Sequence, residues 1–180
     1  KIYNSLLFLL LILSGNVNSQ WVQMSSPSGG QISSIIESGS NIFIGTNGGG
    51  VFMSSNNGSG WSKVNSGLTN LNISCFVVKG SMLFAGTKGG GVFVTTNNGN
   101  SWTNVSNGLT DKFVTALTIK GSEIIAGTGG GGLFFSDNNG TEWTEKNTGL
   151  PGTVITAVVA MDSQIFAAVE GEGIFITVND

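Results

Sequence analysis

Short apolar segments alternate with turn residues along most of this chain. In the middle of the chain, apolar runs cover Ser74–Val78, Leu83–Thr87 and Val92–Thr96, and each ends at a turn rich in glycine or asparagine. Runs of this length, rich in Val, Phe and Thr and bounded by Gly and Asn, predict β-strands. A fourth piece begins at Trp102 and ends near Asn107-Gly108. No segment after the N-terminal region shows the sustained 3.6-residue period of a helix.

The four-strand pattern repeats with a period of about 41 residues. Trp21, Trp61, Trp102 and Trp143 are separated by 40, 41 and 41 residues. A period of 40–45 residues is typical of one propeller blade. Four short antiparallel strands cannot bury both of their faces alone, so the units have to pack side by side. The pattern therefore predicts an all-β propeller of four-stranded antiparallel blades, with a β-solenoid as the structural alternative.

The most specific motif lies between the third and fourth predicted strands of each unit. It reads Ser-Ser-Asn-Asn-Gly-Ser-Gly-Trp at 54–61, Thr-Thr-Asn-Asn-Gly-Asn-Ser-Trp at 95–102 and Ser-Asp-Asn-Asn-Gly-Thr-Glu-Trp at 136–143. This motif resembles the Asp-box, or bacterial neuraminidase repeat, of sialidase-like propellers (SxDxGxxW), and the resemblance covers nearly all of the chain from Gln20. Asn stands where that family usually has Asp. The resemblance implies a propeller whose boxes lie on the rim, away from any active site.

A structural role is the expectation for these box residues. The hydroxyl and the Asn side chain can bond backbone groups inside the turn, glycine supplies an unusual φ, and Trp packs between adjacent units. The residues concerned are Ser54, Asn56, Gly58, Trp61, Thr95, Asn97, Gly99, Trp102, Ser136, Asn138, Gly140 and Trp143. Calcium binding at 137–140 is the alternative, but neutral Asn and a missing acidic ligand set weaken it.

Composition excludes several classes of function. All seven basic residues are lysines, arginine and histidine are absent, and the net charge is −3, so the chain lacks the basic clusters that bind nucleic acid. The single cysteine, Cys75, rules out an internal disulfide and any cysteine-based metal cluster. Because it aligns with Ser34, Ala116 and Ala157, we expect a small buried residue rather than a reactive thiol. No cofactor is expected.

Catalysis finds little support in the residues present. A sialidase site needs an arginine cluster and a tyrosine nucleophile, but the chain has no arginine and only Tyr3 near its start. Propeller glycosidases need two carboxylates about 5–9 Å apart. Asp111 has no acidic counterpart at its level of the repeat, and the one suggestive pair, Glu170 and Glu172, flanks a turn glycine. The remaining acids are Glu37, Glu123, Asp137, Glu142, Glu145, Asp162 and Asp180. We therefore expect no enzyme.

The N-terminal residues resemble an export signal. Lys1 is followed by the apolar run Leu6–Leu13, and Val17-Asn18-Ser19 offers the small residues of a cleavage site. Eight apolar residues are too few to span a bilayer as a helix. The prediction is a signal peptide at 1–19, a propeller domain at 20–180, and secretion or display at the cell surface or in the periplasm.

The two ends of the repeat array allow two interpretations. Trp21–Met24 matches a fourth strand, and Ile155–Thr177 supplies three, so the two pieces could complete one blade and close a four-bladed ring. However, Thr177–Asp180 reads as the first half of another box. This favours a longer propeller with further blades.

We therefore expect an exported binding or scaffolding module for an unidentified protein or glycan. The alternative is a fragment of a propeller glycoside hydrolase whose catalytic residues lie outside this chain. A third reading is a purely architectural spacer.

Overall fold

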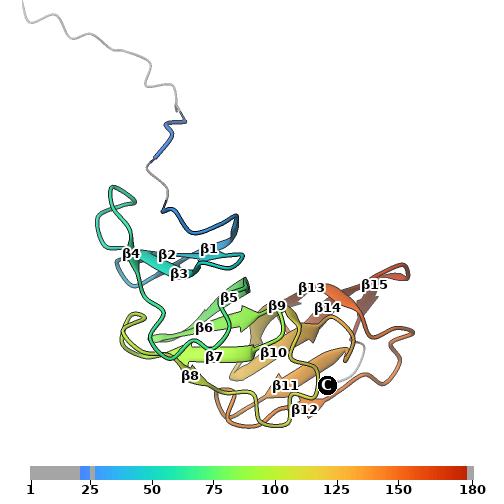
Figure 1. The fold of residues 1–180 in the computed structure, drawn as a ribbon. Helices are drawn as coiled ribbons and strands as arrows, with labels where there is room; N and C mark the ends of the chain where they lie inside the picture. The colour runs from blue at the N-terminus through green and yellow to red at the C-terminus, as the bar shows by residue number, and fades with distance from the viewer. Residues whose placement is uncertain (1–20, 25–26, 178–180) are drawn as a thin grey trace, which may run out of the picture.

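The computed structural model describes residues 21–24 and 27–177, and it consists of four antiparallel sheets (Figure 1). Sheet 1 contains β1 (Ile32–Ser38), β2 (Asn41–Thr46), β3 (Gly50–Ser54) and β4 (Ser62–Lys63). Sheet 2 contains β5 (Ile73–Lys79), β6 (Met82–Thr87), β7 (Gly91–Thr95) and β8 (Thr103–Asn104). Sheet 3 contains β9 (Val114–Lys120), β10 (Glu123–Thr128), β11 (Leu133–Ser136) and β12 (Thr144–Glu145). Sheet 4 contains β13 (Ile155–Met161), β14 (Gln164–Val169) and β15 (Gly173–Ile176).

Each sheet pairs its strands in chain order, as the repeat predicts. In sheet 2, Phe76 of β5 lies opposite Ala85, and Ala85 lies opposite Phe93 of β7. The fourth strand is shorter than the sequence suggests, because only Phe93 and Val94 pair with β8. The prediction of four-stranded antiparallel units is thus confirmed for sheets 1 to 3, while sheet 4 has three strands in the described residues.

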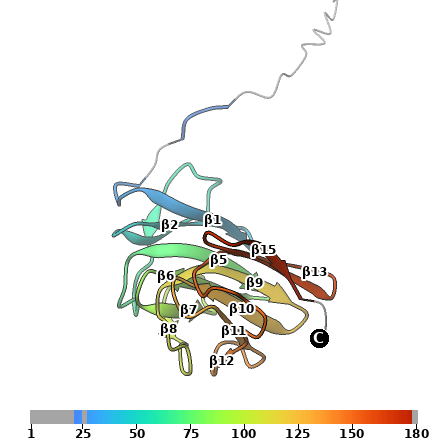
Figure 2. The same ribbon diagram turned by 90° about the vertical axis from the view of Figure 1, so that its right-hand side faces the viewer.

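The sheets stand side by side, with their first strands β1, β5, β9 and β13 in succession (Figures 1 and 2). Glycine in the second strand allows this close approach. A Cβ added at Gly45 would lie 2.4 Å from the Ile73 side chain of the next sheet, and one at Gly127 would lie 2.6 Å from Ile155. Apolar clusters fill each of the three junctions, and the largest fully buried side chains include Phe43, Phe84, Phe93 and Phe134.

The N-terminal part departs from one expectation. Trp21–Met24, predicted to be a fourth strand, belongs to no strand, and the Trp21 side chain is 100% exposed. The strand it would extend, β15, lies in sheet 4, at the other end of the row from sheet 1 (Figure 1). The predicted signal peptide at 1–19 and the residues 178–180 lie outside the described part of the chain. Within that part, no helix is long and apolar enough to cross a membrane.

Candidate functional site

The three turns 54–61, 95–102 and 136–143, which we call the box turns, are held by the same hydrogen bonds. In the second, the buried Thr95 hydroxyl accepts a bond from the Gly99 amide (3.0 Å) and donates one to Asn97 Oδ1 (2.9 Å). Asn97 Oδ1 also accepts a bond from the Ser101 amide (2.9 Å). The same bonds form at Ser54, Asn56, Gly58 and Gly60, and again at Ser136, Asn138, Gly140 and Glu142. The amide oxygen of Asn therefore accepts the same hydrogen bonds that an Asp carboxylate could accept at this position, and it does so without a charge.

Backbone conformation explains the Asn-Gly pair in each box turn. Asn98 has φ 56° and Gly99 has φ 80°, both in the left-handed region, and the other two turns repeat these values closely. Asn and Gly are the residues that adopt such φ values at low cost. These contacts support the structural role expected for the box residues.

Tryptophan from a box turn fills each of the first two junctions. Trp102 is 4% exposed and its Nε1 donates to the carbonyl of Val64 in the preceding sheet (2.8 Å). Trp143 is 3% exposed and makes the equivalent bond to Val105 (2.7 Å). The backbone amide of Trp102 also donates to the carbonyl of Ser66 (2.8 Å). Each indole thus joins two neighbouring sheets.

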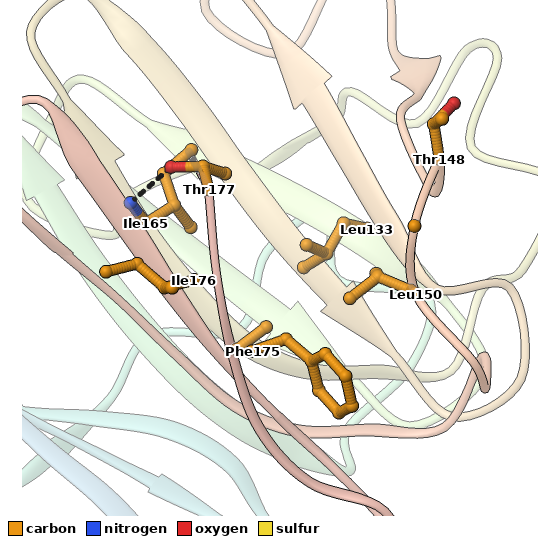
Figure 3. Close-up of a pocket in the computed structure, with 9 residues that line it drawn as sticks. Leu133, Thr148, Leu150, Ile165, Phe175, Ile176 and Thr177 are labelled. Carbon is orange, nitrogen blue, oxygen red and sulfur yellow. Dashed lines mark hydrogen bonds between the residues drawn. The ribbon is translucent and has the colours of Figure 1, made fainter. Parts of the chain in front are cut away.

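The third junction contains no tryptophan and instead has a recess of about 470 Å³. In Figure 3, Leu133, Leu150 and Phe175 point into this space. Sheet 3 and the loop after it provide Leu133, Thr148, Gly149 and Leu150, and sheet 4 provides Ile165, Ala167, Phe175, Ile176 and Thr177. None of these side chains carries a charge. We refer to this set as the recess.

The recess corresponds to the space that an indole fills at the other junctions. Leu150, Ile165 and Phe175 align with Leu109, Ile124 and Phe134, which are buried together with Trp143. A glycine pair makes the same point. A Cβ on Gly108 would lie 2.3 Å from the carbonyl oxygen of Trp143, whereas a Cβ on Gly149 would meet nothing within 4 Å.

Apolar residues are also exposed on the two outer sheet faces. On sheet 1, Ile32 (48% exposed) and Ile35 (68%) occupy positions that Ile73 (0%) and Phe76 (8%) occupy in sheet 2. We call this the leading face. On sheet 4, the exposed side chains are Val159, Met161, Ile174 and Ile176, and we call this the trailing face. The sequence pattern alone did not identify the recess or these faces.

Among the described residues, no acidic side chain lines the recess itself. However, Glu123 and Glu145 line an adjoining hollow of about 540 Å³ that shares Thr148, Ile165 and Thr177 with it. Asp111 accepts bonds from the backbone amides of Phe113 (2.9 Å) and Gly131 (3.0 Å), which ties the loop between sheets 2 and 3 to a glycine turn. Glu123 forms an ion pair with Lys146 (3.3 Å). Glu170 and Glu172 are exposed at the β14–β15 turn. In residues 21–24 and 27–177, no group of three or more His, Cys, Asp or Glu side chains could hold a metal ion.

Cys75 lies on β5 close to Gly86 of β6. Burial raises the pKa of its thiol from 9.0 to about 12, against smaller lowering effects of hydrogen bonds with Ser74 and Gly86. The thiolate is the reactive form of cysteine. The thiol is therefore protonated at neutral pH, which supports the expectation of an unreactive residue. Its side chain is half-buried, however, and not fully buried as the repeat predicts.

Solved structures resemble this fold at low sequence identity. No family model matches the chain, and no curated protein matches it in sequence. The computationally designed Ika4 protein matches 89% of this chain over 98% of its own length, with a TM-score of 0.69 and 13% identity. An ancestral GH74 enzyme matches 89% of this chain, with a TM-score of 0.68 and 21% identity, and the match covers 24% of the enzyme's own length. YCF48 bound to a D1 peptide matches 81% (TM-score 0.62, 14% identity), which spans 48% of that protein.

These likenesses agree with the architecture of the chain itself. The GH74 and YCF48 structures are propellers, and the sheets described here stand side by side as propeller blades do. At these identities the comparison concerns the fold alone. The chain is an all-β protein with the β-propeller fold.

Proposed function

We propose that this chain is an exported, non-catalytic propeller module that binds other proteins. The observation that carries the proposal is the apolar recess beside β15, a strand that pairs only with β14 among the described residues. An unpaired strand edge accepts an extended peptide by backbone hydrogen bonds, and an adjacent apolar pocket selects one of its side chains. A large aromatic side chain suits this recess, because aligned residues surround Trp102 and Trp143 elsewhere in the chain.

Two further observations support a binding role. YCF48, one of the similar structures, was solved with a peptide bound. In the loop between sheets 2 and 3, the Asp111 carboxylate accepts hydrogen bonds from two backbone amides, which gives this acid a structural role. A glycan ligand is less well supported, because stacking on sugars needs exposed aromatic platforms and only Trp21 is fully exposed among the described tryptophans.

A synthetic peptide tests the proposal directly. The peptide of residues 95–107, which carries Trp102 next to its central residue, should bind to the chain with a measurable blue shift of its tryptophan emission. Its Trp102→Ala counterpart should bind at least ~10-fold more weakly, because a buried Trp is commonly a binding hot spot. Binding should also weaken for a Leu150→Ser chain, whose recess is less apolar. Equal binding of both peptides would contradict the proposal.

The second candidate, a fragment of a propeller glycoside hydrolase, is favoured by the likeness to the GH74 enzyme. Release of reducing sugar from xyloglucan, or of sialic acid from a sialylated oligosaccharide, would support it. The matched control is the Glu170→Gln, Glu172→Gln double variant, which removes the acidic pair on either side of Gly171. Turnover that disappears in this variant would overturn the non-catalytic proposal.

A further inference from the structure

The recess and the two exposed faces are parts of one repeated interface. At the second junction, sheet 3 covers the apolar residues of sheet 2, and Trp143 seals the outer edge. At the trailing end of the molecule, the residues equivalent to the covered ones are exposed: Val92 is 0% exposed, but its counterpart Ile174 is 76% exposed. At the leading end, Ile32 and Ile35 are exposed although their counterparts Val114 and Leu117 are buried. In the described part of the chain, sheets 1 and 4 therefore each present one half of a junction.

The N-terminal segment 21–24 carries a tryptophan, Trp21, that aligns with the box tryptophans of the inner junctions. Met24 aligns with Val64 and Val105, which pack against Gly99 and Gly140 of the following box turns. Met24 makes the corresponding contact in sheet 1, because a Cβ on Gly58 would lie 2.8 Å from its Cε. The segment thus already lies where the outer strand of a preceding sheet belongs, and its Trp21 is fully exposed.

The repeat also fixes the register of that outer strand. Val94 pairs with Thr103, and Phe93 pairs with Asn104. Shifting these pairs to the fourth sheet places Val22 opposite Ile176 and Gln23 opposite Phe175. The Trp21 indole would then lie in the recess, and its Nε1 would donate to the carbonyl of Lys146, the counterpart of Val64 and Val105.

We propose that the recess of one copy of this chain accepts Trp21–Met24 of a second copy, so that two copies associate head to tail. This inference rests on the proposed binding function and names the partner. Sheet 1, on which segment 21–24 lies, and sheet 4, which holds the recess, stand at opposite ends of the row (Figure 1). Complementary surfaces at opposite ends of one molecule produce a heterologous contact between copies, which closes into a ring when the rotation allows it.

One residue departs from the repeat at this interface. Gly45, Gly86 and Gly127 leave space for the first strand of the next sheet, but the fourth position is Ala168. Ile32 of the second copy would meet this methyl group, so the sheets must approach less closely than at the inner junctions. Ala168→Gly is therefore expected to increase the affinity between two copies. A variant that merely lost structure would not show such an increase.

Cysteine pairs in the Cys75→Ala background test the docking and its register. A Val22→Cys chain mixed with an Ile176→Cys chain should give, on mild oxidation, a disulfide-linked dimer joining positions 22 and 176. The matched control replaces Ile176→Cys by Ile174→Cys, which is two residues out of register, and its yield should be at least ~10-fold lower because disulfide geometry is narrow. Equal yields from both mixtures would contradict the proposal.

Sedimentation velocity of the unmodified chain provides the second readout. The dimer should dissociate at least ~10-fold more readily in a Trp21→Ala chain, because Trp21 would be the central apolar contact. Since Trp21 is fully exposed in the single chain, its replacement should leave the circular dichroism spectrum unchanged. A chain with both Val22→Cys and Ile176→Cys that forms the disulfide within one molecule at nanomolar concentration would overturn the proposal in favour of self-closure.

The peptide experiment separates the two proposals. If the Trp21→Ala chain binds the 95–107 peptide but the unmodified chain remains monomeric, only the two-copy inference fails. If the peptide does not bind and the chain is monomeric, the binding function of the recess fails as well.

Discussion

The inner junctions and the open ends of this propeller are built from nearly the same residues, yet they differ in what covers them. Phe134 and Phe175 occupy the same repeat position, but Phe134 is fully buried, while Phe175 lies at the edge of the recess. Trp102 and Trp143 are buried, while Trp21 is entirely exposed. Burial in a repeat protein is therefore decided by the neighbouring unit as much as by the residue itself, as expected when stability comes from interfaces between repeats.

Removal of a junction tryptophan should have the largest effect. Trp102→Ala deletes an indole that is 4% exposed and leaves a cavity between sheets 1 and 2, so the free energy of unfolding should fall by about 3–5 kcal/mol. Trp21→Ala, the matched control at an open end, should change it by less than about 0.5 kcal/mol in the single chain. Urea unfolding at low protein concentration measures both. Similar losses for both variants would mean that the two environments do not differ.

Two glycines with the same φ value, one at an inner junction and one beside the recess, sharpen the comparison. Gly67 and Gly149 both have φ 87°, but a Cβ on Gly67 would lie 2.1 Å from the Trp102 carbonyl oxygen, while Gly149 faces open space. Gly149→Ala should cost about 1 kcal/mol from the φ value alone. Gly67→Ala should cost about 1–3 kcal/mol more, because the inner junction must shift. Thermal unfolding of the two variants tests this, and equal costs would contradict it.

A smaller effect is expected inside a box turn. Thr95→Val keeps the shape of the side chain but removes the hydroxyl that bonds Gly99 and Asn97, so we expect a loss of about 1–2 kcal/mol. Thr96→Val, at the exposed neighbouring position, is the control and should be nearly neutral. Chemical denaturation with both variants separates the turn bonds from a general effect of the substitution. A neutral Thr95→Val would show that the hydroxyl is dispensable.

The smallest effect at neutral pH concerns Cys75. Because burial raises the pKa of its thiol to about 12 in the folded chain, the folded state holds the proton more tightly than the unfolded state. This contribution to stability is complete below about pH 9 and is lost as the pH rises toward 12. Cys75→Ala, which copies the residue at the aligned positions 116 and 157, should remove the additional loss of stability over this range. Identical pH profiles for both chains would contradict the raised pKa.

The period of the tryptophans and glycines was sufficient to predict most of the fold. It located the strands β5, β6 and β7 to within one or two residues, because apolar runs and Asn-Gly turns act locally. The turn bonds expected of the box residues also form, since they lie within eight consecutive residues. Trp61, however, is only half-buried, unlike Trp102 and Trp143. The predicted signal peptide, export and additional blades concern other residues or other measurements, and they stay predictions.

The recess and the state of Trp21 could not be derived in the same way. Both depend on whether a neighbouring sheet is present, which is a tertiary property of the whole array. Trp21 has the sequence context of a strand anchor, but it lacks a partner strand at its own end of the molecule and is exposed. The length of the fourth strand was overestimated for a related reason. Val105 and Ser106 still bond Val92 of β7, but at Asn107 the chain bonds the next sheet, where the Asn107 carbonyl accepts the amide of Trp143.

Hydrogen exchange of the Trp21→Ala chain tests most directly that the outer junction is open while the inner ones are sealed. The amides of β7 (Gly91–Thr95), beside Trp102, should be strongly protected. Those of β15 (Gly173–Ile176), beside the recess, should exchange about 100-fold faster or more, because local opening is easier where fewer apolar contacts hold a strand. Protection of β15 equal to that of β7 in this variant would contradict the account.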